Sequence, residues 1–112
     1  MNRTTLRTAV LVLGLVTAIV HLVVLNIRMG GLDLLFTLNG LGYLAFLGTF
    51  FLNPSIVAGR RRLLSYAFMA FTAVTILAWV ALGDMGDRLA WVTKADEVLL
   101  IAALAMNLRH EA

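Results

Sequence analysis

The chain contains no cysteine, and only one of its 112 residues is proline. Without cysteine it cannot form disulfides, thiolate-bound iron–sulfur clusters or cysteine-based zinc sites. With so little proline it can form long uninterrupted helices, because proline breaks a helix interior. Charged residues make up 13% of the chain, against about 25% in an average soluble domain. These shortages exclude several kinds of catalytic and metal centre and indicate long apolar helices.

The chain is instead rich in apolar residues, which make up 62% of it. Four runs each approach the roughly 20 residues that an α-helix needs to cross a bilayer. These runs are Thr8–Ile27, Leu32–Leu52, Leu63–Gly83 and Leu89–Leu108. They are continuous and do not alternate in polarity, which disfavours a membrane β-barrel. The sequence therefore predicts an all-α integral membrane protein.

Short connections separate the four runs, at Arg28–Gly31, Asn53–Arg62 and Asp84–Arg88, and each contains or adjoins helix-breaking residues. Links this short make consecutive helices antiparallel neighbours. We therefore predict a single domain, residues 1–112, folded as an antiparallel up-down-up-down four-helix transmembrane bundle. Its helices are expected at approximately 8–27, 32–52, 63–83 and 88–108.

Basic residues are divided unevenly between the two ends of this predicted bundle. One end holds most of the arginines, namely Arg3, Arg7, Arg60, Arg61, Arg62 and Arg109. Because cytoplasmic segments of membrane proteins are enriched in Lys and Arg, both termini are expected in the cytoplasm of a multi-pass cell-membrane protein. The same arginines are expected to set the topology and contact lipid headgroups. They also explain the net charge of +3, so we expect membrane lipids and no nucleic acid as partners.

Three charged residues, Lys94, Asp96 and Glu97, interrupt the fourth run. Each costs about 2.5–3.5 kcal/mol at the bilayer centre, so this helix needs internal pairing, a water-filled cavity or a partner chain. Other helices offer polar residues at a matching depth, on stripes with helical periodicity. We predict one polar cluster in the outer half of the bundle, capped by Arg28 and made of His21, Asn39, Tyr43, Lys94, Asp96 and Glu97.

Each member of this cluster has a structural interpretation beside the functional one. His21 and Asn39 can serve as hydrogen-bonding residues between helices, and Lys94 can extend toward the membrane interface. Asp96 and Glu97 are adjacent in the sequence and point to different sides of a helix. One of them can pair with Lys94 or His21, and the other then needs a second partner or a proton. At least one of the two carboxylates is a candidate for binding a proton or a ligand.

The sequence predicts no metal site, because His21 is the only histidine in the membrane region and His110 lies at the opposite end. A haem held between two histidines of one chain is excluded for the same reason. A single axial bond from His21 to a haem or chlorin is kept as an alternative, and otherwise no cofactor is expected.

Three short segments carry a family resemblance: His21–Leu22, Asn39–Leu44 and Thr93–Glu97. They resemble small, uncharacterised four-helix integral membrane proteins of prokaryotes. The resemblance implies the fold and implies no established activity.

Two functions of different classes are expected. The absence of catalytic spacing favours a non-enzymatic structural or accessory subunit of a membrane assembly, working alone, as a homo-oligomer or with other subunits. The alternative is a bundle that responds to, or transports, protons or a small solute through the polar cluster. In that case Asp96 or Glu97 would titrate and His21 would relay the proton.

Overall fold

The computed structural model describes residues 1–111, which contain helices and the turns that join them, with no strand. The long helices are α1 (Arg3–Ile19), α3 (Leu34–Leu52), α5 (Arg61–Leu82) and α6 (Arg88–Asn107). The first of them continues through η1 (Val20–Val24) and α2 (Leu25–Met29), and two short helices are α4 (Ser55–Ala58) and η2 (Leu108–His110). The all-helical prediction is confirmed for the described residues.

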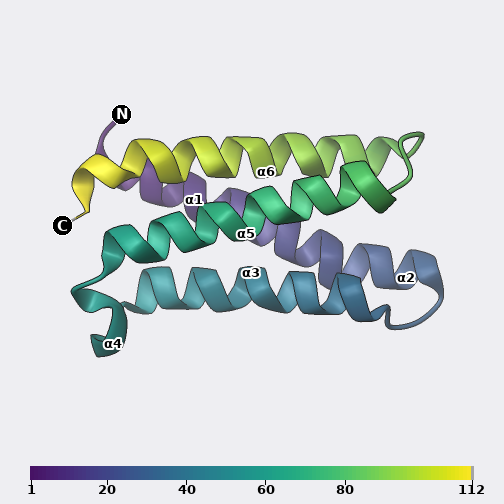
Figure 1. Cartoon of the computed structure of the whole chain (residues 1–112), viewed down its shortest axis with the longest axis horizontal. Coiled ribbons are helices and arrows are strands. Elements are labelled where there is room, and N and C mark those ends of the chain that lie inside the picture. Colours follow the sequence, from purple (N-terminus) through teal and green to yellow (C-terminus); the bar gives the residue numbers. More distant parts are fainter. Residues whose placement is uncertain (112) are drawn as a thin grey trace.

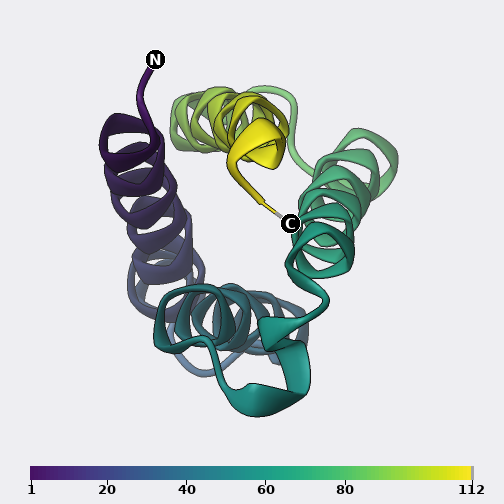
Figure 2. The same cartoon turned by 90° about the vertical axis from the view of Figure 1, so that its left-hand side faces the viewer.

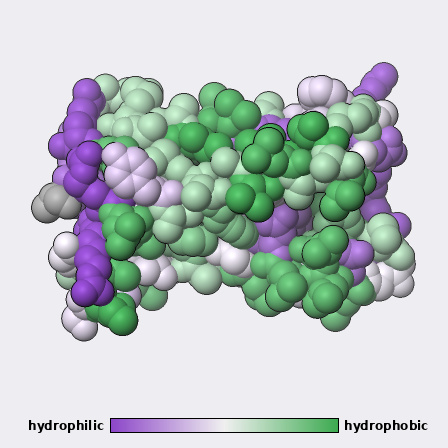
Figure 3. All heavy atoms as spheres, in the orientation of Figure 1, coloured by the Kyte–Doolittle hydropathy of each residue, from purple (hydrophilic) through white to green (hydrophobic). Residues whose placement is uncertain are grey.

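Three helical segments within residues 1–111 are long and apolar enough to cross a membrane, namely Arg3–Met29, Leu34–Leu52 and Arg61–Leu82. Helix α6 has a comparable length, but Lys94, Asp96 and Glu97 make it more polar. Figure 3 shows a broad hydrophobic band across the middle of the molecule, with hydrophilic residues concentrated at both ends. Such a band is suited to lipid, because soluble monomers rarely expose contiguous apolar surface of this extent.

The long helices lie side by side along the 42 Å axis of the molecule (Figure 1). Both termini and α4 lie at one end, here called the terminal end, and the turns after α2 and α5 lie at the far end. Viewed from the terminal end, the helices surround a common interior in the order α1, α6, α5 and α3 (Figure 2). Helix α3 packs extensively against α1 and its continuation, and much less against α5.

Polar caps set the helix boundaries. The Asn2 side chain accepts a hydrogen bond from the Thr5 backbone at 2.8 Å, so the first helix begins at Arg3, before the predicted start at residue 8. Asp33 caps α3 and Asp87 caps α6 in the same way. These caps satisfy backbone N–H groups that the first turn of a helix leaves unpaired.

The core of the terminal half is apolar and includes Leu6, Val10, Leu47, Phe50, Phe68, Leu100 and Leu104. Arg61 is buried beside this core, although the sequence predicted a headgroup contact for it. Its Nε donates to Glu111 Oε2 at 2.8 Å, and its Nη1 donates to the Phe50 carbonyl, also at 2.8 Å. Arg61 therefore anchors α5 to the neighbouring chain segments. The exposed arginines of this end are Arg3, Arg60, Arg62 and Arg109, and Arg7 lies partly exposed over the Phe50 ring.

Candidate functional site

His21 lies in η1, a five-residue π-helical segment that interrupts the first helix. Segments of this kind are rare and often occur at functional sites. Helix α3 approaches the segment closely, because a Cβ atom built on Gly40 would lie 2.4 Å from Cγ of Leu22. Glycine at this position lets the two helices pack, while His21 projects into the interior and is only 3% exposed.

Glu97 of α6 is the centre of a buried network. Its Oε2 accepts hydrogen bonds from the Thr17 hydroxyl at 2.7 Å and from the Tyr43 hydroxyl at 3.1 Å. Its Oε1 lies 2.8 Å from Nζ of Lys94. The network joins α1, α3 and α6. Because Glu97 is fully buried, the ion pair with Lys94 balances a charge that would otherwise be strongly unfavourable inside the protein.

Thr17 also fixes the ring of His21. The Nδ1 atom of His21 lies 2.8 Å from the Thr17 carbonyl oxygen, which can only accept, so Nδ1 carries the hydrogen. The Thr17 hydroxyl, 3.2 Å from Nδ1, gives its own hydrogen to Glu97. In the neutral ring the remaining nitrogen, Nε2, is therefore an acceptor without a partner among residues 1–111.

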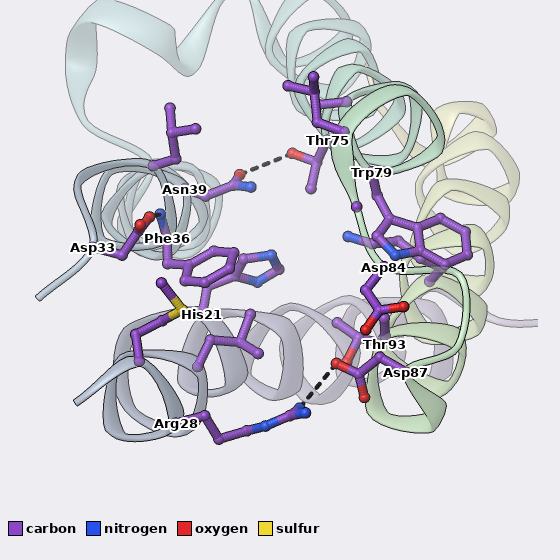
Figure 4. A pocket seen from close by; sticks show the side chains of 18 residues that line it. His21, Arg28, Asp33, Phe36, Asn39, Thr75, Trp79, Asp84, Asp87 and Thr93 are labelled. Atoms are coloured by element: carbon purple, nitrogen blue, oxygen red, sulfur yellow. Dashed lines mark hydrogen bonds and ion pairs between the residues drawn. The ribbon is translucent and has the colours of Figure 1, made fainter. Parts of the chain in front are cut away.

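A cavity of about 460 Å³ lies in the far half of the molecule, between the first helix, α3, α5 and α6. This volume falls within the range of pockets that bind small molecules. Its polar lining includes His21, Asn39, Thr75 and Lys94. Thr75 donates to Oδ1 of Asn39 at 2.8 Å, which leaves the Asn39 amide nitrogen as a donor with no partner among the described residues. Figure 4 shows the His21 ring and the Asn39 amide facing the same space.

Charged residues surround the outer rim of this cavity. Nη1 of Arg28 lies 3.0 Å from Oδ2 of Asp87, and the pair spans from α2 to the start of α6 (Figure 4). The hydrogen bond from Arg28 lowers the pKa of Asp87 below the ordinary carboxyl value, since it favours the ionised form. Asp33 and Asp84 also line the rim. Their carboxylates accept hydrogen bonds from backbone N–H groups at 3.0 and 2.8 Å.

The apolar walls of the cavity include Leu25, Met29, Leu35, Phe36, Ala78, Leu82 and Ala90. Trp79 completes one wall, and its ring centroid lies 4.8 Å from that of Trp91 in an edge-to-face contact. Among the described residues, the cavity wall therefore carries an unpartnered acceptor, His21 Nε2, and an unpartnered donor, the Asn39 amide. The indole Nε1 of Trp79 is a further buried donor without a partner there.

Most of the residues singled out from the sequence lie together. His21, Tyr43, Lys94 and Glu97 belong to the buried network or contact it, while Asn39 lines the cavity and Arg28 lies at its rim. Asp96 is the member that the structure does not connect. It is half-buried on α6, and its Oδ2 has no hydrogen-bond partner among residues 1–111.

Two further residues of the site, Thr17 and Thr75, were absent from the predicted cluster. A single threonine in an apolar helix carries little signal, because it commonly bonds to its own helix backbone. The one available signal was spacing, since Thr17 lies four residues before His21 and so shares its helix face. No comparable pattern marks Thr75.

Within the described residues, no group of three or more histidine, aspartate or glutamate side chains is arranged to hold a metal ion. His21 alone offers a free ring nitrogen to the cavity, which is the single bond that the haem or chlorin alternative needs. A visible absorption band in the purified protein, lost in His21→Phe, is the observation that this alternative requires.

Comparison with protein-family models, with curated proteins and with solved structures gives no match for this chain. The resemblance to small four-helix prokaryotic membrane proteins therefore stays a prediction. The functional argument depends on the geometry of the site.

Proposed function

We propose that this chain is a non-enzymatic, multi-pass membrane protein that binds a small solute in the cavity between His21, Asn39 and Lys94. The proposal has two parts. The first is that α6 acts as the fourth span of an antiparallel up-down-up-down transmembrane bundle. The second is that the cavity in the far half of that bundle is the binding site.

The internal pairing of its charges supports α6 as a membrane span. Lys94 and Glu97 form an ion pair 2.8 Å long, and both side chains are turned away from the outer surface. The exposed face of the helix is apolar and includes Trp91, Val92, Val98, Leu99 and Met106. Because Lys94 and Glu97 are buried and paired with each other, the cost of placing this helix in lipid falls below that of three isolated charges.

The distribution of arginine supports an orientation with both termini in the cytoplasm. The terminal end holds Arg3, Arg7, Arg60, Arg61, Arg62 and Arg109, whereas the far end holds two arginines beside three aspartates. The rule that positive residues stay inside then places the cavity in the outer leaflet of the cell membrane.

The single observation that carries the binding proposal is the cavity of about 460 Å³ with unpartnered polar groups on its wall. A bundle with a purely structural role gains stability by filling such a space, because empty volume in a core costs free energy. The His21 acceptor and the Asn39 donor both face this volume. A buried polar group without a partner is unfavourable, so a bound molecule or water must supply the missing hydrogen bonds.

The native chain lacks cysteine, so single cysteines can test access to the cavity. Ala90→Cys on α6 places a thiol on the cavity wall, and Ala102→Cys places one on the exposed face of the same helix. We expect a small water-soluble methanethiosulfonate to react with Ala90→Cys at least about tenfold faster, because the reactive thiolate forms only where water reaches it. Equal rates at the two positions would contradict a water-accessible binding cavity.

An accessory subunit of a membrane assembly is the second candidate, and Asp96 favours it. This carboxylate lies half-buried on α6, with one oxygen enclosed and unpartnered among the described residues. A partner chain with a basic or hydroxyl side chain would satisfy it. We expect a native assembly purified through this chain to lose subunits in Asp96→Leu and to keep them in Asp84→Leu. A chain that is monomeric in native membrane extracts rules this candidate out.

A further inference from the structure

On the side between α3 and α5, the cavity is lined by exposed residues, and in the proposed topology this side faces lipid. Near the middle of the molecule, two contacts hold α3 and α5 together. A Cβ atom on Gly42 would lie 2.5 Å from Cζ of Phe71, and Asn39 is hydrogen-bonded to Thr75. Beyond them, toward the far end, Leu35 and Leu82 both line the cavity and are 68% and 80% exposed. Figure 3 shows hydrophilic residues within the hydrophobic band, on the far half of the molecule.

The rim of this side opening is apolar, so its natural environment is the acyl chains of the bilayer. A molecule that enters by this route must be soluble in lipid. The wall of the cavity requires a polar group on the same molecule, because Nε2 of His21 can accept a hydrogen bond and the Asn39 amide can donate one. A hydroxyl group is both a donor and an acceptor, so its chemistry matches the needs of both residues.

The two cations that line the cavity are already paired. Lys94 is paired with Glu97, and Arg28 is paired with Asp87. The remaining carboxylates, Asp33 and Asp84, lie at the rim and accept backbone hydrogen bonds. Among residues 1–111, the unpaired charges that line the cavity are these two rim aspartates, so a charged headgroup at the depth of His21 would find no counter-charge beside it. Burying an unpaired ion is strongly unfavourable.

We propose that the cavity takes a neutral amphiphile with a hydroxyl headgroup, which enters from the lipid between α3 and α5. Its hydroxyl donates to His21 Nε2 and accepts from the Asn39 amide, and its apolar tail lies along Leu35, Phe36 and Leu82. This inference rests on the proposed solute-binding function and specifies its ligand class.

The two tryptophans of the chain report on occupancy, because Trp79 lines the cavity and Trp91 packs on it. Three probes share one eight-carbon chain and differ in charge: 1-octanol, octylammonium and octanoate. Each is added to the full chain in nanodiscs, and its membrane concentration is measured separately. We expect 1-octanol to change the fluorescence saturably, at a membrane concentration at least about tenfold lower than either ion requires.

Variants locate the response. His21→Phe should weaken the 1-octanol response by up to about tenfold, the worth of one net hydrogen bond. The matched variant His110→Phe, at the terminal end, should leave it unchanged. Ala90→Phe fills the cavity without removing a hydrogen bond and should abolish saturation, which keeps the test informative if His21→Phe fails to fold.

The outcomes separate this inference from the proposed function. A response as strong to octylammonium or octanoate overturns the neutral class, while solute binding stands. No saturable response to any probe, with Ala90→Cys still accessible to the water-soluble reagent, also overturns the inference alone. Loss of both the response and the accessibility overturns the inference together with the proposed function.

Discussion

At the scale of single residues, Glu97 shows how this chain can bury charge in an apolar bundle. Its carboxylate has three partners from three helices: the Thr17 hydroxyl, the Tyr43 hydroxyl and the Lys94 ammonium. Removing one partner of such a buried pair is much worse than removing both, because the charge left behind has no compensation. Comparing a single variant with a double variant can therefore test the ion pair between Lys94 and Glu97.

We expect Glu97→Gln to destabilise the protein by about 3 kcal/mol, since it leaves the Lys94 ammonium unpaired. The double variant Glu97→Gln with Lys94→Met should recover much of this loss. Unfolding of the purified protein in mixed micelles measures both effects. A double variant as unstable as the single one would show that the ion pair is not the main interaction of Glu97.

A second residue-scale prediction concerns pH. The pKa of Asp87 lies below its ordinary value of 3.8, with Arg28 as the main cause. The contribution of this pair to stability is therefore complete above the ordinary value and disappears as the pH falls through the lower, folded-state pKa. Asp87→Asn keeps a capping side chain and removes the charge, so it should lower the melting temperature at pH 7. The difference from the native chain should vanish once the pH is below the folded-state pKa of Asp87.

If Asp87→Asn still melts below the native chain by the same amount at low pH, the cause is a weaker cap on α6 and not the lost ion pair. Asp84→Asn serves as the control, because within residues 1–111 the Asp84 side chain accepts a hydrogen bond from the Gly86 backbone and makes no ion pair. Because Asp84 is outside the ion pair with Arg28, Asp84→Asn should leave the melting temperature at pH 7 close to that of the native chain.

At the scale of helices, apolar composition predicts where the long helices lie, whereas local irregularities within them depend on contacts with neighbouring helices. The long helices could be predicted from the apolar runs, because length and hydropathy are local properties of the sequence. The π-helical segment around His21 could not be predicted, since it depends on how α3 approaches the first helix. The short helix α4 was also missed, as it forms within a stretch rich in helix-breaking residues.

Two glycines of α3 provide a matched test of this packing. A Cβ atom on Gly40 would lie 3.0 Å from the backbone nitrogen of Leu22, whereas one on Gly48 meets nothing within 4 Å. Gly40→Ala should therefore destabilise the fold by about 1–3 kcal/mol, and Gly48→Ala should stabilise it by about 0.5–1 kcal/mol. Thermal or denaturant unfolding of the two variants measures both changes. If they behave alike, the close approach at Gly40 is not required.

At the scale of the whole molecule, depth within the bilayer predicted which polar residues could meet. Counting residues from the helix ends placed His21, Asn39 and Lys94 at one level, and all three line the same cavity. Arg61 escaped this argument because its burial depends on Glu111, fifty positions along the chain. From the sequence, the run of three arginines that contains Arg61 suggested contact with lipid headgroups. The cavity itself was beyond the sequence, since its volume depends on small differences in helix packing.

The proposed topology predicts which end of the molecule faces outward. Met85→Cys lies in the turn after α5, and Ser55→Cys lies in α4 at the terminal end. In intact cells, a membrane-impermeant maleimide should label Met85→Cys and spare Ser55→Cys until the membrane is permeabilised. The reverse pattern would invert the orientation, and labelling of both positions would contradict a multi-pass arrangement with a single orientation.

The ion pair between Arg61 and Glu111 has a consequence for biogenesis. Arg61 emerges from the ribosome fifty residues before Glu111. In the proposed topology, α5 therefore enters the bilayer while its guanidinium still lacks this carboxylate partner. If α6 is the fourth span, closure of the terminal end waits until α6 has inserted and returned Glu111 to that end. The proposed topology thus makes insertion of α6 and formation of the ion pair between Arg61 and Glu111 a single event.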